Sequence, residues 1–152
     1  KAQGSLDATL PTKNAGTFSA GLSVDSKAGF TGANLGYTYR REHWSLSART
    51  NFNDKGFASS RVDGEFHQGP VSATSSLSFV QTGFDAASAR VTWAPNAKLN
   101  LSSGLDYSNR ESKLSMTTEV SYRPQPNLSF ALSARADSKG GSWAGIGARL
   151  TF

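Results

Sequence analysis

Ionic side chains spaced two residues apart are the part of this sequence that could do chemistry. Arg61, Asp63 and Glu65 occupy every second position, and Arg49 has a similar place in the preceding segment. Residues two apart share one face of an extended chain, so these side chains form the densest cluster of charge. Opposed charges of this kind create a transverse field that orients polar solutes, or they join in structural ion pairs. Both interpretations remain open.

Two histidines and no cysteines limit the catalytic possibilities. His43 opens one alternating segment and His67 closes the next, so both are expected at one rim. Serine is so abundant that a serine near either histidine is uninformative, and a histidine pair lacks a clear third metal ligand. No glycine-rich phosphate loop leads into a helix, and the basic residues are not clustered with stacking aromatic residues. We therefore predict no enzyme, no cofactor, no metal site and no nucleic-acid partner.

The elements that must position these residues are strands, because apolar and polar residues alternate almost everywhere. In residues 43–53, Trp44, Leu46 and Phe52 fall on one face, whereas Ser47 and Arg49 fall on the other. A period of two is typical of a half-buried strand, and helical spacing is not found. The alternation predicts eleven strands, at about 2–10, 17–25, 30–40, 43–53, 57–67, 71–81, 84–93, 98–108, 113–123, 128–138 and 142–152.

Short turns that contain glycine or proline separate these segments. No gap is long enough for a crossover helix, so neighbouring strands are expected to pair as antiparallel hairpins. The dipeptides Gly29-Phe30, Gly56-Phe57 and Gly83-Phe84 recur 27 residues apart, the length of one hairpin with its two turns. A fixed period also occurs in solenoids. Strands of about ten residues are long for a solenoid, so we expect a meander that closes into a barrel.

Charge divides between one face of the strands and their ends. The face opposite the apolar stripes carries seven arginines and seven acidic residues, so the net charge of +5 lies in turns and at strand ends. We expect this face, otherwise rich in Ser, Thr, Gly and Asn, to line a hydrated and weakly selective pore. A narrow barrel plugged by ion pairs is the alternative. The predicted pore-lining residues are Arg49, Arg61, Asp63, Glu65, Arg90, Asp106, Glu119, Arg135 and Arg149.

The apolar face carries no charge in mid-strand, and we expect it to contact lipid. Strands of about ten residues match a tilted crossing of a bilayer. The face mixes Leu and Val with Ala, Thr, Ser and Gly, which suits fluid lipid tails better than a tightly packed core. Aromatic residues gather near the strand ends, as in the interfacial girdles of membrane barrels. The predicted girdle residues are Tyr37, Tyr39, Trp44, Phe66, Trp93, Tyr122 and Phe152.

The last segment, SWAGIGARLTF, resembles the C-terminal strand of bacterial outer-membrane β-barrels. Ala144, Ile146, Ala148 and Leu150 alternate up to a terminal Phe152. The resemblance implies an all-β, antiparallel up-and-down transmembrane β-barrel of about 10–12 strands in a Gram-negative outer membrane. It also implies that the barrel-assembly machinery recognises this strand and that an export signal has been removed. The upper turns are as short as the lower ones, so loops that carry ligand specificity are not expected.

Domain and strand number leave alternatives. We expect one barrel domain over residues 1–152, or the C-terminal part of a larger barrel. Bacterial single-chain barrels have an even number of strands. Either residues 1–16 form a partial strand or extension, which leaves ten strands, or one further strand brings the number to twelve.

The most direct functional prediction is a passive channel for small solutes, or an export pore for a polymer, with a Ser/Thr/Gly-rich lumen of mixed charge. One alternative is a non-conducting barrel that anchors or completes a larger outer-membrane secretion assembly and binds its other subunits. Another is a soluble extracellular β-rich adhesin or fibre module. In the membrane interpretations the partners are outer-membrane lipid and the barrel-assembly machinery, and the Lys and Arg residues at the rims meet anionic headgroups.

Overall fold

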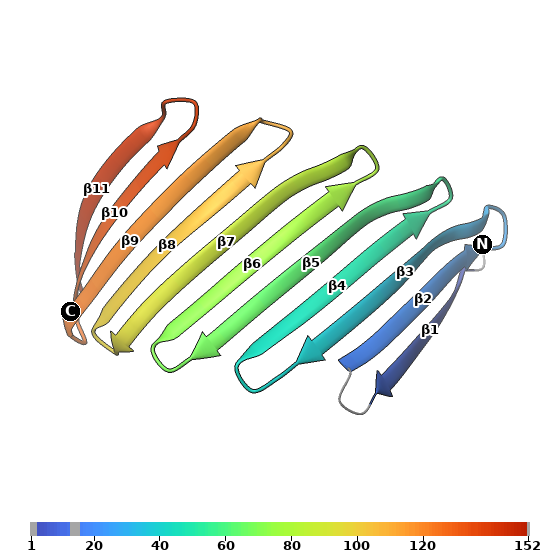
Figure 1. Ribbon diagram of the computed structural model, residues 1–152, viewed down its shortest axis with the longest axis horizontal. Coiled ribbons are helices and arrows are strands. Elements are labelled where there is room, and N and C mark those ends of the chain that lie inside the picture. The colour runs from blue at the N-terminus through green and yellow to red at the C-terminus, as the bar shows by residue number, and fades with distance from the viewer. Residues whose placement is uncertain (1–2, 13–15, 152) are drawn as a thin grey trace. The chain divides into compact units, whose positions relative to one another are not determined.

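The computed structural model describes residues 3–12 and 16–151, and β-strands make up most of them. The strands are hydrogen-bonded in chain order from β1 to β11 (Figure 1). The prediction of an all-β, antiparallel up-and-down arrangement is confirmed. Within the described ranges, no helix is long and apolar enough to cross a membrane. The strands are β1 (Gln3–Thr12), β2 (Gly16–Asp25), β3 (Gly29–Arg40), β4 (Trp44–Asn53), β5 (Gly56–Gln68), β6 (Val71–Val80), β7 (Gly83–Asn96), β8 (Leu99–Ser108), β9 (Lys113–Gln125), β10 (Leu128–Asp137) and β11 (Ser142–Leu150).

Three strands run through a proline beyond the end that the sequence predicts. β1 continues through Pro11, β7 through Pro95 and β9 through Pro124, all of which lie outside the predicted strands. Proline has no N–H to donate to a neighbouring strand, so it is tolerated where the ladder is irregular. The register between β7 and β8 does shift, between Trp93 and Asn96, and Pro95 lies in this interval.

Glycine opens alternate strands at the turns that the 27-residue repeat marks. Gly29, Gly56 and Gly83 are the first residues of β3, β5 and β7. Their φ angles are 71°, 104° and 115°, a region that residues with a Cβ rarely adopt. The repeat is therefore the signature of a turn that needs glycine.

The phenylalanine after the glycine packs back across its own hairpin. Phe57 contacts Phe52 with ring centroids 6.3 Å apart, and Phe84 contacts Phe79 at 5.7 Å. Both contacts are edge-to-face, which is a favoured geometry for aromatic pairs. At these two turns the Gly-Phe dipeptide supplies both the turn glycine and an aromatic contact across the hairpin, whereas Phe30 of the first dipeptide lies opposite Val24.

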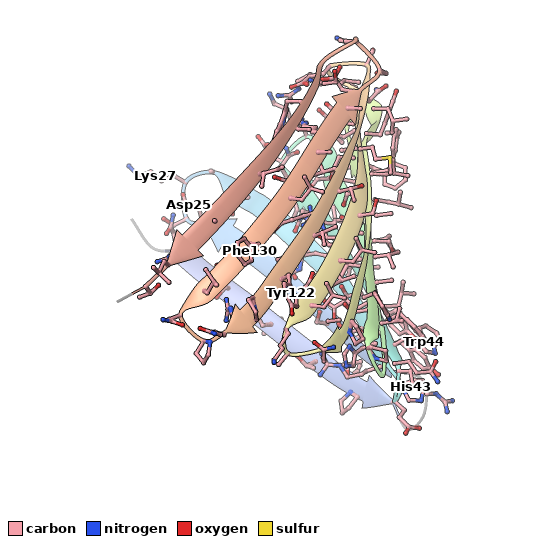
Figure 2. The ribbon with its side chains drawn as sticks, turned by 90° about the vertical axis from the view of Figure 1, so that its left-hand side faces the viewer. Asp25, Lys27, His43, Trp44, Tyr122 and Phe130 are labelled. Carbon is pink, nitrogen blue, oxygen red and sulfur yellow. The ribbon has the colours of Figure 1, made fainter. Side chains whose placement is uncertain are left out.

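Aspartate and asparagine side chains close the turns by accepting backbone N–H groups. Asp25 Oδ1 accepts the amide of Lys27 at 2.8 Å, and Asn53 Oδ1 accepts the amide of Lys55 at 2.9 Å. The bonded amides lie two residues on, which is the arrangement of an Asx turn. In both turns the lysine follows as an exposed residue (Figure 2 labels Asp25 and Lys27).

Two compact units make up the chain. The first holds the chain up to Gly64 together with Ser76–Asp85, and the second holds Glu65–Ser75 together with the chain from Ala86 on. Each unit contains its own set of hydrogen-bonded strands, and each is described separately below.

In the first unit, apolar residues lie opposite apolar residues across the strands. β1 pairs with β2 along its whole length, from Gln3↔Asp25 to Thr12↔Gly16, so it is a full strand of the sheet. One row, on what we call the apolar face, consists of Leu6, Leu22, Ala33 and Phe52. The adjacent row, on the polar face, consists of Asp7, Gly21, Asn34 and Asn51.

The second unit repeats this division over β7 to β11. The register from β7 to β11 puts one apolar row beside one polar row. The apolar row consists of Trp93, Leu101, Val120, Leu132 and Ile146. The polar row consists of Thr92, Ser102, Glu119, Ser133 and Gly145. Strict alternation along the strands therefore becomes two chemically distinct faces.

The apolar side chains do not pack into a dry interior. Among residues 3–12 and 16–151, no apolar side chain is buried, and Leu6 and Ile146 are 71% and 86% exposed. Soluble proteins rarely expose contiguous apolar patches of more than a few hundred Å². The apolar face is therefore a surface that requires an apolar environment.

Candidate solute-binding face

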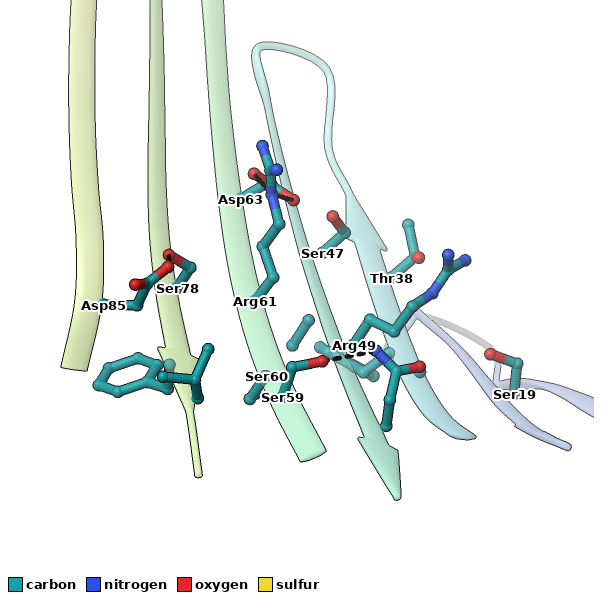
Figure 3. Close-up of a pocket in the computed structure, with 16 residues that line it drawn as sticks. Ser19, Thr38, Ser47, Arg49, Ser59, Ser60, Arg61, Asp63, Ser78 and Asp85 are labelled. Carbon is teal, nitrogen blue, oxygen red and sulfur yellow. Dashed lines mark hydrogen bonds and ion pairs between the residues drawn. The ribbon is translucent and has the colours of Figure 1, made fainter. Parts of the chain in front are cut away.

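A pocket of about 600 Å³ opens on the polar face of the first unit (Figure 3). Arg49 of β4 and Arg61 and Asp63 of β5 line it, so the structure brings together three of the predicted pore-lining residues. The other polar side chains that line it are Ser19, Thr38, Ser47, Asn51, Ser59, Ser78 and Asp85. Ionic groups surrounded by hydroxyl and amide groups can bind a charged or hydrogen-bonding solute.

Glycines make room for polar side chains on this face. Gly36 lies opposite Arg49, and a Cβ at Gly36 would collide with the Ser19 hydroxyl of the strand on its other side. In the second unit, a Cβ at Gly104 would lie 3.4 Å from Nε of Arg90. The glycines therefore leave space into which neighbouring polar side chains extend.

The two arginines of the pocket differ in their partners. Arg61 Nε donates to both carboxylate oxygens of Asp63, at 2.8 and 3.0 Å. The two side chains are 64% and 36% exposed, so this ion pair is in contact with water. Arg49 forms no ion pair with any residue that the structure describes, and its guanidinium lies toward Thr38 (Figure 3).

Asp85 is a residue of this pocket that the predicted pore-lining set does not include. It lies inside β7 and lines the pocket, and Ser78 Oγ donates to its Oδ2 at 3.4 Å. Because Phe84 packs against Phe79, the next residue in the chain points to the opposite, polar side. Strict alternation counted back from Ala87 and Ala89 would put Asp85 on the apolar face. The sequence therefore gives no signal for its place on the polar face.

The remaining predicted pore-lining residues belong to the second unit. Glu65 is exposed and lies in the part of β5 that belongs to this unit. The other five lie opposite small or polar residues, in the pairs Arg90↔Gly104, Asp106↔Ser115, Glu119↔Ser133, Arg135↔Thr117 and Arg149↔Ser129. They share the polar face, but the structure does not bring them into one cluster. Their role in lining a pore stays a prediction.

A second pocket, of about 500 Å³, lies on this face of the second unit. Glu119 and Arg123 line it together with Ser121 and Ser129. Neither Glu119 nor Arg123 forms an ion pair with a residue in the described part of the chain. The polar face of the second unit therefore also presents charges of both signs to solvent.

Trp143 is a polar-face residue that the sequence analysis does not single out. It lies opposite Arg135, and its side chain extends along β11 over Gly145, where a Cβ would lie 3.1 Å from the indole. Trp143 and the apolar-face residue Ile146 are three positions apart, and residues an odd number of positions apart in a strand point to opposite faces. This spacing could have placed Trp143 on the polar face. An exposed indole beside an arginine gives this face an apolar contact surface as well as charge.

Several predicted girdle residues contact other aromatic residues. Tyr39 and Trp44 have ring centroids 5.2 Å apart, and the Arg41 guanidinium lies 5.6 Å from the Tyr39 ring and donates to its hydroxyl. Tyr37 contacts Phe18 at 4.7 Å.

In the second unit, Tyr122 lies opposite Phe130 on the apolar face (Figure 2), Trp93 lies in the apolar row, and Phe66 is exposed. Phe152 lies outside the described residues. The girdle stays a prediction about how these residues meet a membrane.

Comparison with solved structures finds similarity to porins. One is described as "KdgM porin in complex with disordered oligogalacturonate", with 12% identity, a TM-score of 0.47, and coverage of 99% of this chain and 92% of that chain. Another, "KdgM porin", has 12% identity, a TM-score of 0.48 and the same coverage. No protein family profile and no characterised protein sequence matches the chain.

Proposed function

We propose that this chain forms the wall of a passive channel in a bacterial outer membrane, with the polar face toward water and the apolar face toward lipid. The observation that carries the proposal is the division of the strands into a charged face and an apolar face, with no buried apolar core among the residues that the structure describes. Membrane strands alternate in this way, because every second side chain contacts hydrocarbon. The backbone is hydrogen-bonded from strand to strand, as a lipid environment requires.

The polar face supports a channel role better than a plug of ion pairs. Two ion pairs, Arg61–Asp63 and Lys113–Asp137, are found among the described residues. Arg49, Arg90 and Arg135 have no such partner there, so their charges remain available to solutes. We therefore expect the channel to transport small polar solutes and to discriminate between them by their charge.

Conductance measurement is the experiment that tests the proposal. The full-length protein, purified in detergent and added to planar bilayers, is expected to give stepwise ohmic currents in KCl. Protein that inserts into the bilayer without conducting would contradict the channel proposal and favour the barrel that anchors a larger assembly. Arg49→Glu is expected to shift the selectivity toward cations, and unchanged selectivity would remove Arg49 from the pore wall.

A further inference from the structure

We propose that Asp63 masks Arg61, so that Arg49 is the one guanidinium in the first unit's pocket that binds an anionic solute. This inference rests on the proposed channel function, because it assigns the charge selectivity of that site. The solute class is a small carboxylate or phosphate anion. Four observations on β3, β4, β5 and β7 carry it.

Arg61 and Arg49 lie directly opposite each other on neighbouring strands. Thr50 and Ser60 hydroxyls are hydrogen-bonded at 3.1 Å, and Asn51 Nδ2 donates to Ser59 Oγ at 3.1 Å. These two bonds set the register of β4 against β5, and continuing it by one step places position 49 opposite position 61. Like charges directly opposite on a sheet repel each other.

Asp63 removes this repulsion by holding Arg61 along its own strand. The carboxylate lies two residues further on and on the same face, where it accepts Nε of Arg61 with both oxygens. Figure 3 shows the Arg61 guanidinium against Asp63 and the Arg49 guanidinium turned away from it. The Arg61–Asp63 pair as a whole has no net charge, and Nε of Arg61 engages both carboxylate oxygens.

Arg49 keeps its full charge and has the surroundings of an anion site. Its neighbour across the strand pair is Gly36, and the Ser19 hydroxyl extends into the place that a Cβ of Gly36 would take. Ser47 and Thr38, which lie opposite each other, add two hydroxyl donors along the same edge of the pocket. A guanidinium fork supplemented by hydroxyl donors matches the geometry of carboxylate and phosphate oxygens.

Asp85 is too far away to cancel the charge of Arg49. It lies on β7, three strands from β4, which corresponds to about 14 Å at the usual strand spacing. The Debye length in 0.1 M salt is about 10 Å, so this interaction is largely screened across water. The pocket therefore presents a positive end at β4 and a negative end at β7.

The test is a double-mutant cycle read by the binding of inorganic phosphate. Block of the KCl current by phosphate gives a dissociation constant for the full-length protein and each variant in planar bilayers. Arg49→Gln is expected to weaken phosphate binding at least fivefold. The double variant Arg61→Gln/Asp63→Asn, which removes the neutral pair, is expected to bind phosphate within twofold of the unmodified protein.

Asp63→Asn alone is the distinguishing variant. It frees Arg61 beside Arg49 and is expected to tighten phosphate binding at least fivefold, and adding Arg61→Gln is expected to abolish this gain. The proposal is overturned if removing the pair weakens binding as much as Arg49→Gln does. It is equally overturned if Asp63→Asn leaves the affinity unchanged, or if the unmodified protein does not bind phosphate.

Calorimetric titration of phosphate into the detergent-solubilised protein separates this inference from the channel proposal. The same ranking of variants is expected there without any current. If the variants rank as expected in phosphate affinity but the protein never conducts, only the channel proposal is contradicted. If the protein conducts but Arg49→Gln and the double variant Arg61→Gln/Asp63→Asn weaken phosphate binding equally, only the masking inference is contradicted. The denaturant midpoint of each variant controls for misfolding.

Discussion

Two pairs of hydroxyl groups on the apolar face are hydrogen-bonded to each other. Thr50 and Ser60 hydroxyls lie 3.1 Å apart, and those of Ser103 and Thr118 lie 3.2 Å apart in the second unit. In hydrocarbon an unpaired hydroxyl has no water to bond, so mutual pairing lowers the cost of having it there. Paired hydroxyl groups are therefore what we expect on a face that contacts lipid.

A pair of single and double substitutions tests this interpretation. Ser60→Ala leaves the Thr50 hydroxyl without its partner, and we expect it to lower the free energy of unfolding in lipid by about 1 kcal/mol. Adding Thr50→Val removes the stranded hydroxyl and is expected to restore most of that loss. Denaturant titration of the protein in lipid bilayers measures both effects.

The adjacent residues of the same two strands provide the control. Asn51 and Ser59 form an equivalent bond on the polar face, where water can replace a lost partner. We expect Ser59→Ala to change the free energy of unfolding by less than about 0.5 kcal/mol. Equal losses for Ser59→Ala and Ser60→Ala would mean that the two faces have the same surroundings.

At the scale of the element, the Gly-Phe hairpins depend on a backbone conformation. Gly56 has a φ of 104°, and no atom lies within 4 Å of where a Cβ would be, so only backbone strain opposes a side chain there. We expect Gly56→Ala to destabilise the protein by about 1–3 kcal/mol.

Gly147 is the matched control, because its Cβ site is equally open and its φ is not positive. We expect Gly147→Ala to be close to neutral. The unfolding midpoints of both variants in lipid measure the difference, and two equally stable variants would show that the turn tolerates a side chain.

Strands and mid-strand faces could be predicted from the sequence, because a period of two has a single structural meaning when it persists for ten residues. The positions of Phe84 and Asp85 could not, because alternation is interrupted next to the turn glycine and the aromatic contact decides the face. The pairing of Arg61 with Asp63, leaving Arg49 single, depends on side-chain conformation. The sequence therefore shows how many charged residues a face carries, but it does not show which of them are left without an ion-pair partner and can bind a solute.

At the scale of the whole molecule, the opposite faces of one strand should respond differently to the same charge. Leu132 and Ser133 are neighbours at the middle of β10, in the apolar and polar rows respectively. We expect Leu132→Arg to cost ~2–4 kcal/mol of folding free energy in a bilayer, as lipid-facing cations do near the midplane. Ser133→Arg is expected to cost less than about 1 kcal/mol, and comparable costs in equilibrium folding titrations would refute the assignment of faces.

The exposed apolar face also predicts how the purified protein behaves. We expect the full-length protein to be monodisperse in detergent and to aggregate when the detergent is removed, because so much apolar surface then meets water. Sedimentation velocity with and without detergent measures this. A monodisperse protein in plain buffer would support the soluble adhesin or fibre module instead.

The Gly-Phe turns have a consequence for how such chains could change in size. Each 27-residue unit starts from the same kind of turn and brings the chain back to it after two strands. Duplicating or deleting one unit would widen or narrow the sheet by two strands while every other side chain kept its side. Tandem copying of a short gene segment would thus change the number of strands by two and leave the alternation of the remaining strands intact.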